Sequence, residues 1–112
     1  MDGRPLPSID AITAAASSDV VLLDVREFQE WMAGRAPSAI HIPMGEIVER
    51  IDEIDRTRRV VCICRSGNRS SRVTQYLLDQ GFDAVNMTGG MNAWASAQLP
   101  MVNHAGNPGV VI

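Results

Sequence analysis

The chain has no lysine, and all ten of its Lys and Arg positions are arginine. This absence excludes a lysine Schiff base and leaves guanidinium groups as the side-chain cations that recognise any anion. Cysteine is scarce as well, with Cys62 and Cys64 as the only two. Residues two apart on a strand point to the same face with Cα atoms about 7 Å apart, so a disulfide between them would need local distortion. We therefore expect free thiols and a reducing compartment, which makes the cytoplasm the expected location.

Long apolar runs and basic stripes are also missing. No run approaches the roughly 20 apolar residues of a membrane helix, and the segment 1–5 lacks the basic and apolar regions of a signal peptide. The formal net charge is −3, which argues against a nucleic-acid partner. At 112 residues, the chain is expected to form one soluble domain that binds neither membrane nor nucleic acid.

What the sequence does contain is an alternation of strand and helix patterns. Apolar, β-branched runs predict buried strands over residues 20–24, 38–42, 59–64 and 83–87. Helical spacing and stop signals predict helices over residues 8–17, with Ser8 as N-cap, and over 27–33, 44–54, 68–80 and 91–98. This order indicates an α/β fold with a parallel sheet covered by helices on both faces. The tail, 101–112, is expected either to add an edge strand or to be loosely ordered.

In such folds the site lies outside the carboxyl ends of the strands. The segments 24–27, 64–70 and 88–90 leave those ends and should converge on one pocket. The second is the most informative, because an apolar strand ends in Cys64 and a short polar loop leads into a helix. Backbone N–H groups of such a loop and helix N-terminus stabilise a thiolate and any anion bound to it. We therefore predict that Cys64 is a nucleophile.

The predicted anion-binding loop consists of Arg65, Ser66, Gly67, Asn68, Arg69 and Ser70. Gly67 can take the positive φ that turns N–H groups inward. Asn68 and Ser70 can cap the helix or donate hydrogen bonds, and Arg65 and Arg69 supply positive charge at the rim. The loop is thus suited both to activating Cys64 and to attracting a negatively charged donor.

Together with four other segments, this loop resembles the rhodanese (sulfurtransferase) family. The matching segments are residues 22–27, 40–43, 64–70, 81–82 and 89–94. The resemblance implies a three-layer fold with a central, mostly parallel sheet in a domain over residues 1–100. It also implies that Cys64 carries sulfur as a persulfide from a donor such as thiosulfate to a thiol or cyanide acceptor, without a cofactor.

There are two alternative functions. Phosphatases and arsenate reductases with a cysteine nucleophile place an arginine six positions after it, where this chain has Ser70, and Arg69 comes one position too early. The spacing therefore argues against them. The other function is a sulfur-relay or interaction module that serves a partner protein, and the residues leave that alternative open.

The remaining candidates have simpler roles. Cys62 is expected to be a small buried apolar residue. Asp24 and Arg26 are expected to support the site by pairing beneath it or by bonding loop backbone. His41 and His104 have no partners at metal-ligand spacing, so no metal site is predicted.

Overall fold

The computed structural model describes residues 5–112 and shows an α/β fold built on a five-stranded parallel sheet. The strand order is β1-β5-β4-β2-β3, with β4 at the centre. The strands are β1 (Ser8–Ile9), β2 (Val20–Asp24), β3 (Ile40–His41), β4 (Arg59–Ile63) and β5 (Ala84–Met87). The helices are α1 (Ala11–Ala16), α2 (Phe28–Ala33), α3 (Asn68–Asp79) and α4 (Gly90–Ser96), with short 3-10 helices η1 (Met44–Glu46) and η2 (Ile51–Glu53).

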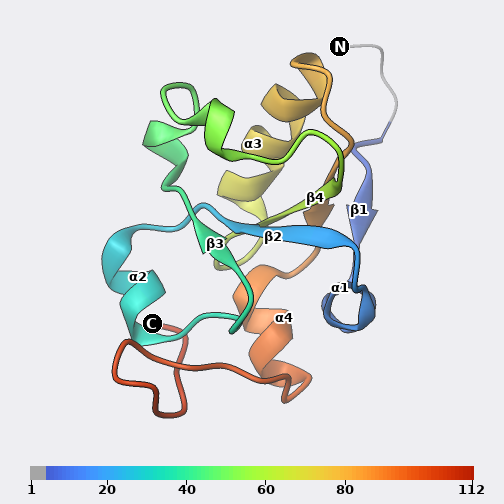
Figure 1. The fold of residues 1–112 in the computed structure, drawn as a ribbon. Helices are drawn as coiled ribbons and strands as arrows, with labels where there is room; N and C mark the ends of the chain where they lie inside the picture. Colours follow the sequence, from blue (N-terminus) through green and yellow to red (C-terminus); the bar gives the residue numbers. More distant parts are fainter. Residues whose placement is uncertain (1–4) are drawn as a thin grey trace.

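The helices form layers on the two faces of the sheet, as the sequence predicts (Figure 1). Helix α3 covers one face together with the η1–η2 segment, and α1 and α4 cover the other. Because every strand pair is parallel, the carboxyl ends of β2, β4 and β5 lie at one edge of the sheet. The segments that leave these three ends are therefore brought together.

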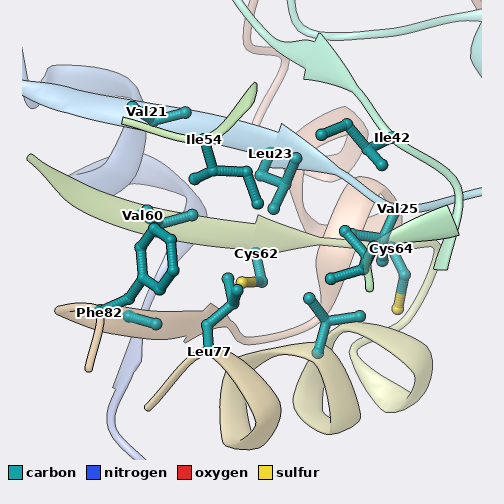
Figure 2. Close-up of a cluster of buried hydrophobic side chains, with 13 residues drawn as sticks. Val21, Leu23, Val25, Ile42, Ile54, Val60, Cys62, Cys64, Leu77 and Phe82 are labelled. Carbon is teal, nitrogen blue, oxygen red and sulfur yellow. The ribbon is translucent and has the colours of Figure 1, made fainter. Parts of the chain in front are cut away.

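Alternation along β4 divides the hydrophobic core between the two faces. Val60 and Cys62 point to the side of α3, whereas Val61 and Ile63 point to the side of α1 and α4. Figure 2 shows the α3 side, where Cys62 lies between Leu23 and Leu77, and Cys64 lies beyond it at the end of the strand. Both faces of β4 are buried, which explains its continuous run of apolar residues.

Two predicted helices differ from the observed elements. Ser8 does not cap a helix but pairs in β1 with Asn86 of β5, and Asp10 is the N-cap of α1 through its bond from the Thr13 N–H at 2.7 Å. A side chain two residues further on thus provides the cap. The segment 44–54 is not one helix but two 3-10 helices joined by turns, because Arg50 leaves the helical conformation at φ −110° and ψ 18°.

The tail folds back against α2 and does not extend the sheet. Within the described chain its only ladder contacts are isolated antiparallel bridges of Val102 with Arg35 and Pro108. The Val110 N–H donates to the Ala33 carbonyl at 2.9 Å, and Gly34 lies directly against the Val110 backbone. The expected alternatives, an edge strand or a loosely ordered tail, are thus replaced by a segment anchored to the end of α2.

None of the helices found in residues 5–112 has the length and apolar character needed to cross a membrane.

Candidate active site

Cys64 lies one residue beyond β4, at the carboxyl edge of the sheet, and its side chain points to the α3 side (Figure 2). The residue is 1% exposed. Its sulfur accepts hydrogen bonds from the Gly67 N–H at 3.0 Å and from the Ser70 hydroxyl at 3.2 Å. The predicted nucleophile and two of its predicted loop residues are therefore in direct contact.

Gly67 turns the loop around the sulfur. It is the N-cap of α3 in the left-handed conformation, with φ at 111°, and no side chain caps the helix there. A Cβ at Gly67 would meet only ordinary contacts, the nearest at 3.7 Å, so the backbone conformation and not the available space calls for glycine. Of the two roles predicted for Asn68 and Ser70, capping of the helix is not observed, whereas Ser70 does donate a hydrogen bond, to the Cys64 sulfur. The first N–H groups of this 12-residue helix are therefore left to face the sulfur.

These hydrogen bonds determine the protonation of Cys64. Burial raises the pKa of its thiol. Hydrogen bonds from the Ser70 hydroxyl and from the N–H groups of Ser70, Gly67 and Ser66 lower this pKa by more than burial raises it. The net pKa lies below the ordinary value of a cysteine, so the site favours a thiolate.

Cys62 lies two residues earlier on the same face and behaves in the opposite way. Burial raises the pKa of its thiol to about 12, which the hydrogen bond with Thr74 only partly offsets. It is a free thiol with no exposed surface, surrounded by core side chains. Cys62 is therefore the small, buried apolar residue that the sequence predicts.

Arg69 is held by an ion pair. Its two terminal nitrogens bond the two carboxylate oxygens of Glu30, on α2, at 2.7 and 2.8 Å. The Arg69 guanidinium holds the pKa of Glu30 below its usual range. The predicted positive charge of Arg69 is therefore present beside the loop but paired with Glu30, which weakens its attraction for a negatively charged donor.

Arg65 lies at the surface on the rim of the loop. Its Nε donates to the main-chain carbonyl of Ile112 at 3.0 Å, which ties the loop to the tail. The carbonyls of Cys64 and Arg65 accept bonds from the Met91 and Asn92 N–H groups of α4, at 2.8 and 3.0 Å. The start of the loop is thus held both by the tail and by α4.

The segment that follows β5 packs against the cysteine loop as predicted. Gly90, with φ at 54°, brings its Cα so close that a Cβ there would clash with the Cys64 and Arg65 carbonyls. Only glycine fits this contact, which places the N-terminus of α4 beneath the loop.

Asp24 and Arg26 form a buried pair at the end of β2. Arg26 Nη2 bonds Asp24 Oδ2 and the Gly34 carbonyl, each at 2.7 Å, and neither side chain is more than 1% exposed. The Arg26 carbonyl in turn contacts His41 Nε2 at 2.7 Å. These contacts connect β2, β3 and the end of α2, and they include the pairing of Asp24 with Arg26 that is one of the two predicted alternatives.

Sequence reasoning missed two residues of the site, Glu30 and Asn86. Glu30 also closes the N-terminus of α2, since its carboxylate accepts from the Glu27 N–H at 3.1 Å. Asn86 bonds both Ser70 and Gly67 from β5. An asparagine within an otherwise apolar buried strand was the available signal, because a buried amide needs partners.

Metal ligands do not gather at this site. Across residues 5–112, no three side chains of His, Cys, Asp and Glu come close enough together to hold a metal ion.

Known proteins are similar to this chain in sequence and in fold. The family model of the rhodanese-like domain matches residues 10–97. The chain is 46% identical over 85 residues to the Bacillus subtilis protein named "Putative sulfurtransferase YtwF", covering 76% of this chain and 82% of that protein. It is 37% identical over 93 residues to the B. subtilis protein named "Putative sulfur carrier protein YrkF", covering 80% of this chain and 50% of that protein.

A solved structure has the same architecture. The rhodanese-related protein from Thermoplasma volcanium superposes with a TM-score of 0.82 at 31% identity, over 86% of this chain and 97% of that one. The fold and the cysteine loop define a rhodanese-like domain, and the chain belongs to the rhodanese family.

Proposed function

We propose that this domain is a sulfurtransferase in which Cys64 carries a sulfane sulfur as a persulfide. The observation that supports this most is the pair of donors, the Gly67 N–H and the Ser70 hydroxyl, directed at the Cys64 sulfur. They favour a nucleophilic thiolate, and the neighbouring N–H groups can stabilise the anion that forms on it.

In the first step, the Cys64 thiolate attacks the outer sulfur of a donor such as thiosulfate. The new S–S bond forms as the bond between the two donor sulfurs breaks, and sulfite leaves with that electron pair. The product is a Cys64 persulfide whose negative charge lies on the outer sulfur. No external oxidant or reductant is needed, because the transferred sulfur brings its own oxidation level.

In the second step, a thiolate or cyanide acceptor attacks the outer sulfur. The S–S bond to Cys64 breaks, and the Cys64 thiolate leaves with the electron pair. An acceptor persulfide or thiocyanate forms, and the loop is restored. The same N–H groups serve both steps, and no cofactor is involved.

Recognition of the donor rests mainly on backbone N–H groups. Arg69 is paired with Glu30, and Arg65 lies at the rim. Ser66 and the first residue of α3, Asn68, line the same turn and contribute main-chain groups. Asp24 and Arg26 pair with each other at the end of β2, the strand beside β4, and we assign them a supporting role only.

A second function is supported by one relative. Half of the protein named as a sulfur carrier aligns with this chain, so a similar domain there is joined to further sequence. In that alternative the acceptor is a protein and turnover of small molecules is incidental. Either function requires a free Cys64 thiol, so we expect the protein to work in a reducing compartment such as the cytoplasm.

Steady-state kinetics with thiosulfate and cyanide test the proposal. We expect double-displacement kinetics, with parallel lines in reciprocal plots, because sulfite leaves before the acceptor binds. Transfer only to a co-purified protein, with no turnover of small acceptors, would favour the relay. Hydrolysis of para-nitrophenyl phosphate that disappears in Cys64→Ser would contradict both functions, and we expect none, since Ser70 occupies the position of the phosphatase arginine.

A further inference from the structure

Asn86 has no role in the mechanism above, yet its side chain contacts the cysteine loop twice. It lies on β5, is 9% exposed and pairs in register with Cys62. Its Oδ1 lies 2.6 Å from the Ser70 hydroxyl, and its Nδ2 donates to the Gly67 carbonyl at 3.2 Å. The second bond determines the orientation of the amide, because a rotated amide would place two acceptors against each other.

These two partners are the residues that donate to the Cys64 sulfur. The Gly67 N–H and the Ser70 hydroxyl reach it at 3.0 and 3.2 Å. A single amide group on a neighbouring strand therefore holds both Gly67 and Ser70, two of the residues that donate to the nucleophile. No other side-chain hydrogen bond found in residues 5–112 connects β5 to this loop.

The Ser70 hydroxyl has one proton and two acceptors within reach. It can donate to Asn86 Oδ1 or to the Cys64 sulfur, but not to both at full strength. When Cys64 is a thiol, the S–H can donate to Ser70 while Ser70 donates to Asn86. When Cys64 is a thiolate, the hydroxyl proton must turn to the sulfur, which leaves Asn86 Oδ1 without that donor.

We propose that Asn86 is a positioning residue that competes with Cys64 for the hydroxyl proton of Ser70 and so sets the balance between the free and sulfur-loaded forms of Cys64. The part concerning the loaded form rests on the proposed function. In a persulfide, the charge moves to the outer sulfur, and the Cys64 sulfur becomes a weak acceptor. The Ser70 proton can then return to Asn86, so the competition favours the loaded form over the thiolate.

Charged groups near the loop do not depend on Asn86. On the elements around the loop these are the Glu30–Arg69 pair with Glu27 beside it, the buried Asp24–Arg26 pair and Arg65 at the rim, and the neutral Cys62 thiol lies two residues before Cys64. A neutral substitution of Asn86 leaves every one of these charges in place. A change in the titration of Cys64 in such a variant must therefore come from hydrogen bonding.

A double-mutant cycle separates competition for the proton from simple support of the loop. The variants are Asn86→Leu, Ser70→Ala and the combination, and Asn107→Leu, at an exposed asparagine of the tail, is the control. The readout is the pH dependence of Cys64 alkylation. We expect Asn86→Leu to lower the thiol pKa by about one pH unit when Ser70 is present, a tenfold change in the equilibrium. In the Ser70→Ala background it should leave the pKa unchanged or raise it.

Equal pKa changes in the two backgrounds would overturn the proposal, because Asn86 would then act only through Gly67. If the leucine variant is unstable, Asn86→Asp tests the same competition through a pKa change of the opposite direction. Its carboxylate holds the Ser70 proton more firmly, so the pKa should rise, and most of that rise should vanish in Ser70→Ala. A rise of the same size in both backgrounds would reflect charge alone and would also overturn the competition.

Loading provides a second readout. At a fixed ratio of thiosulfate to sulfite, Asn86→Leu should carry up to about tenfold less persulfide than the unsubstituted protein, because its thiolate is more stable. If no protein in the set can be loaded while the alkylation cycle behaves as expected, the proposed function fails and the role of Asn86 stands. If the protein is loaded but the alkylation cycle shows no coupling between Asn86 and Ser70, the role proposed for Asn86 fails and the proposed function stands.

Discussion

Cys62 and Cys64 are two residues apart on one chain segment, point to the same side of the sheet and are both buried, yet their thiols differ in kind. The pKa of Cys62 is raised to about 12 by burial, whereas that of Cys64 is lowered by hydrogen bonds that outweigh burial. The difference comes from where the strand ends. Backbone N–H groups within β4 pair with neighbouring strands, and those after residue 64 are free to face a sulfur.

A nucleophile of this kind therefore needs no unusual side chain beside it. The charges near Cys64 are largely paired, and the donors to its sulfur are one N–H, one hydroxyl and the start of α3. The Ser70 hydroxyl and the loop N–H groups together lower the pKa of the Cys64 thiol, so the contrast between the two cysteines tests the geometry of the loop.

The largest effect is expected from exchanging each cysteine for serine. Cys64→Ser should reduce sulfur transfer to background, because a serine hydroxyl is not ionised at neutral pH and cannot form a persulfide. Cys62→Ser should keep activity within about threefold and lose some stability, since a polar hydroxyl replaces a buried thiol. Transfer kinetics and thermal unfolding check both. Loss of transfer in both folded variants would require a mechanism with two cysteines.

The next effect concerns Gly67, which holds φ at 111°. Gly67→Val should raise the thiol pKa by about one pH unit and slow transfer about tenfold, because a left-handed conformation costs a β-branched residue roughly 1–2 kcal/mol. The pH dependence of Cys64 alkylation measures it: the midpoint should move to higher pH. The control is Gly45→Val, where a Cβ meets nothing within 4 Å. A folded Gly67→Val with an unchanged midpoint would show that the loop N–H groups do not activate Cys64.

A smaller effect should follow when the Glu30–Arg69 pair is unbalanced. Glu30→Gln keeps a side chain that can accept from the Glu27 N–H but removes the negative charge that neutralises Arg69. The thiolate then faces a net cation, so the thiol pKa should fall by about half a pH unit at low salt and recover at high salt. Glu46→Gln, which disturbs only the exposed pair with Arg50, is the control. An unchanged pKa at low salt would mean that Arg69 has no influence on Cys64.

The smallest effect is expected at Arg65. Arg65→Ala should raise the KM for thiosulfate about two- to threefold at low ionic strength and leave kcat and the thiol pKa unchanged, because a rim charge acts on binding. Arg59→Ala, at the opposite end of β4, should change neither parameter. A drop in kcat together with a higher thiol pKa would instead place Arg65 among the groups that activate the sulfur.

The sequence predicted the parts of the molecule that depend on local pattern. Apolar runs identified β2 and β4, and Gly67, three residues after Cys64, indicated the turn that holds the sulfur. Local pattern failed for the segment 44–54, where helical spacing of apolar residues occurs without a continuous helix. It also could not reveal that Glu30 neutralises Arg69 or that Asn86 bonds Ser70. Those contacts join residues 39 and 16 positions apart, which only the packed fold brings together.

The most direct test of the account is the intact mass of the two cysteine variants after incubation with thiosulfate and again after addition of cyanide. The account predicts that Cys62→Ser gains the mass of one sulfur atom and loses it to cyanide, whereas Cys64→Ser gains nothing. A sulfur atom on Cys64→Ser, or none on folded Cys62→Ser, would contradict the claim that the loop makes Cys64 the sulfur carrier.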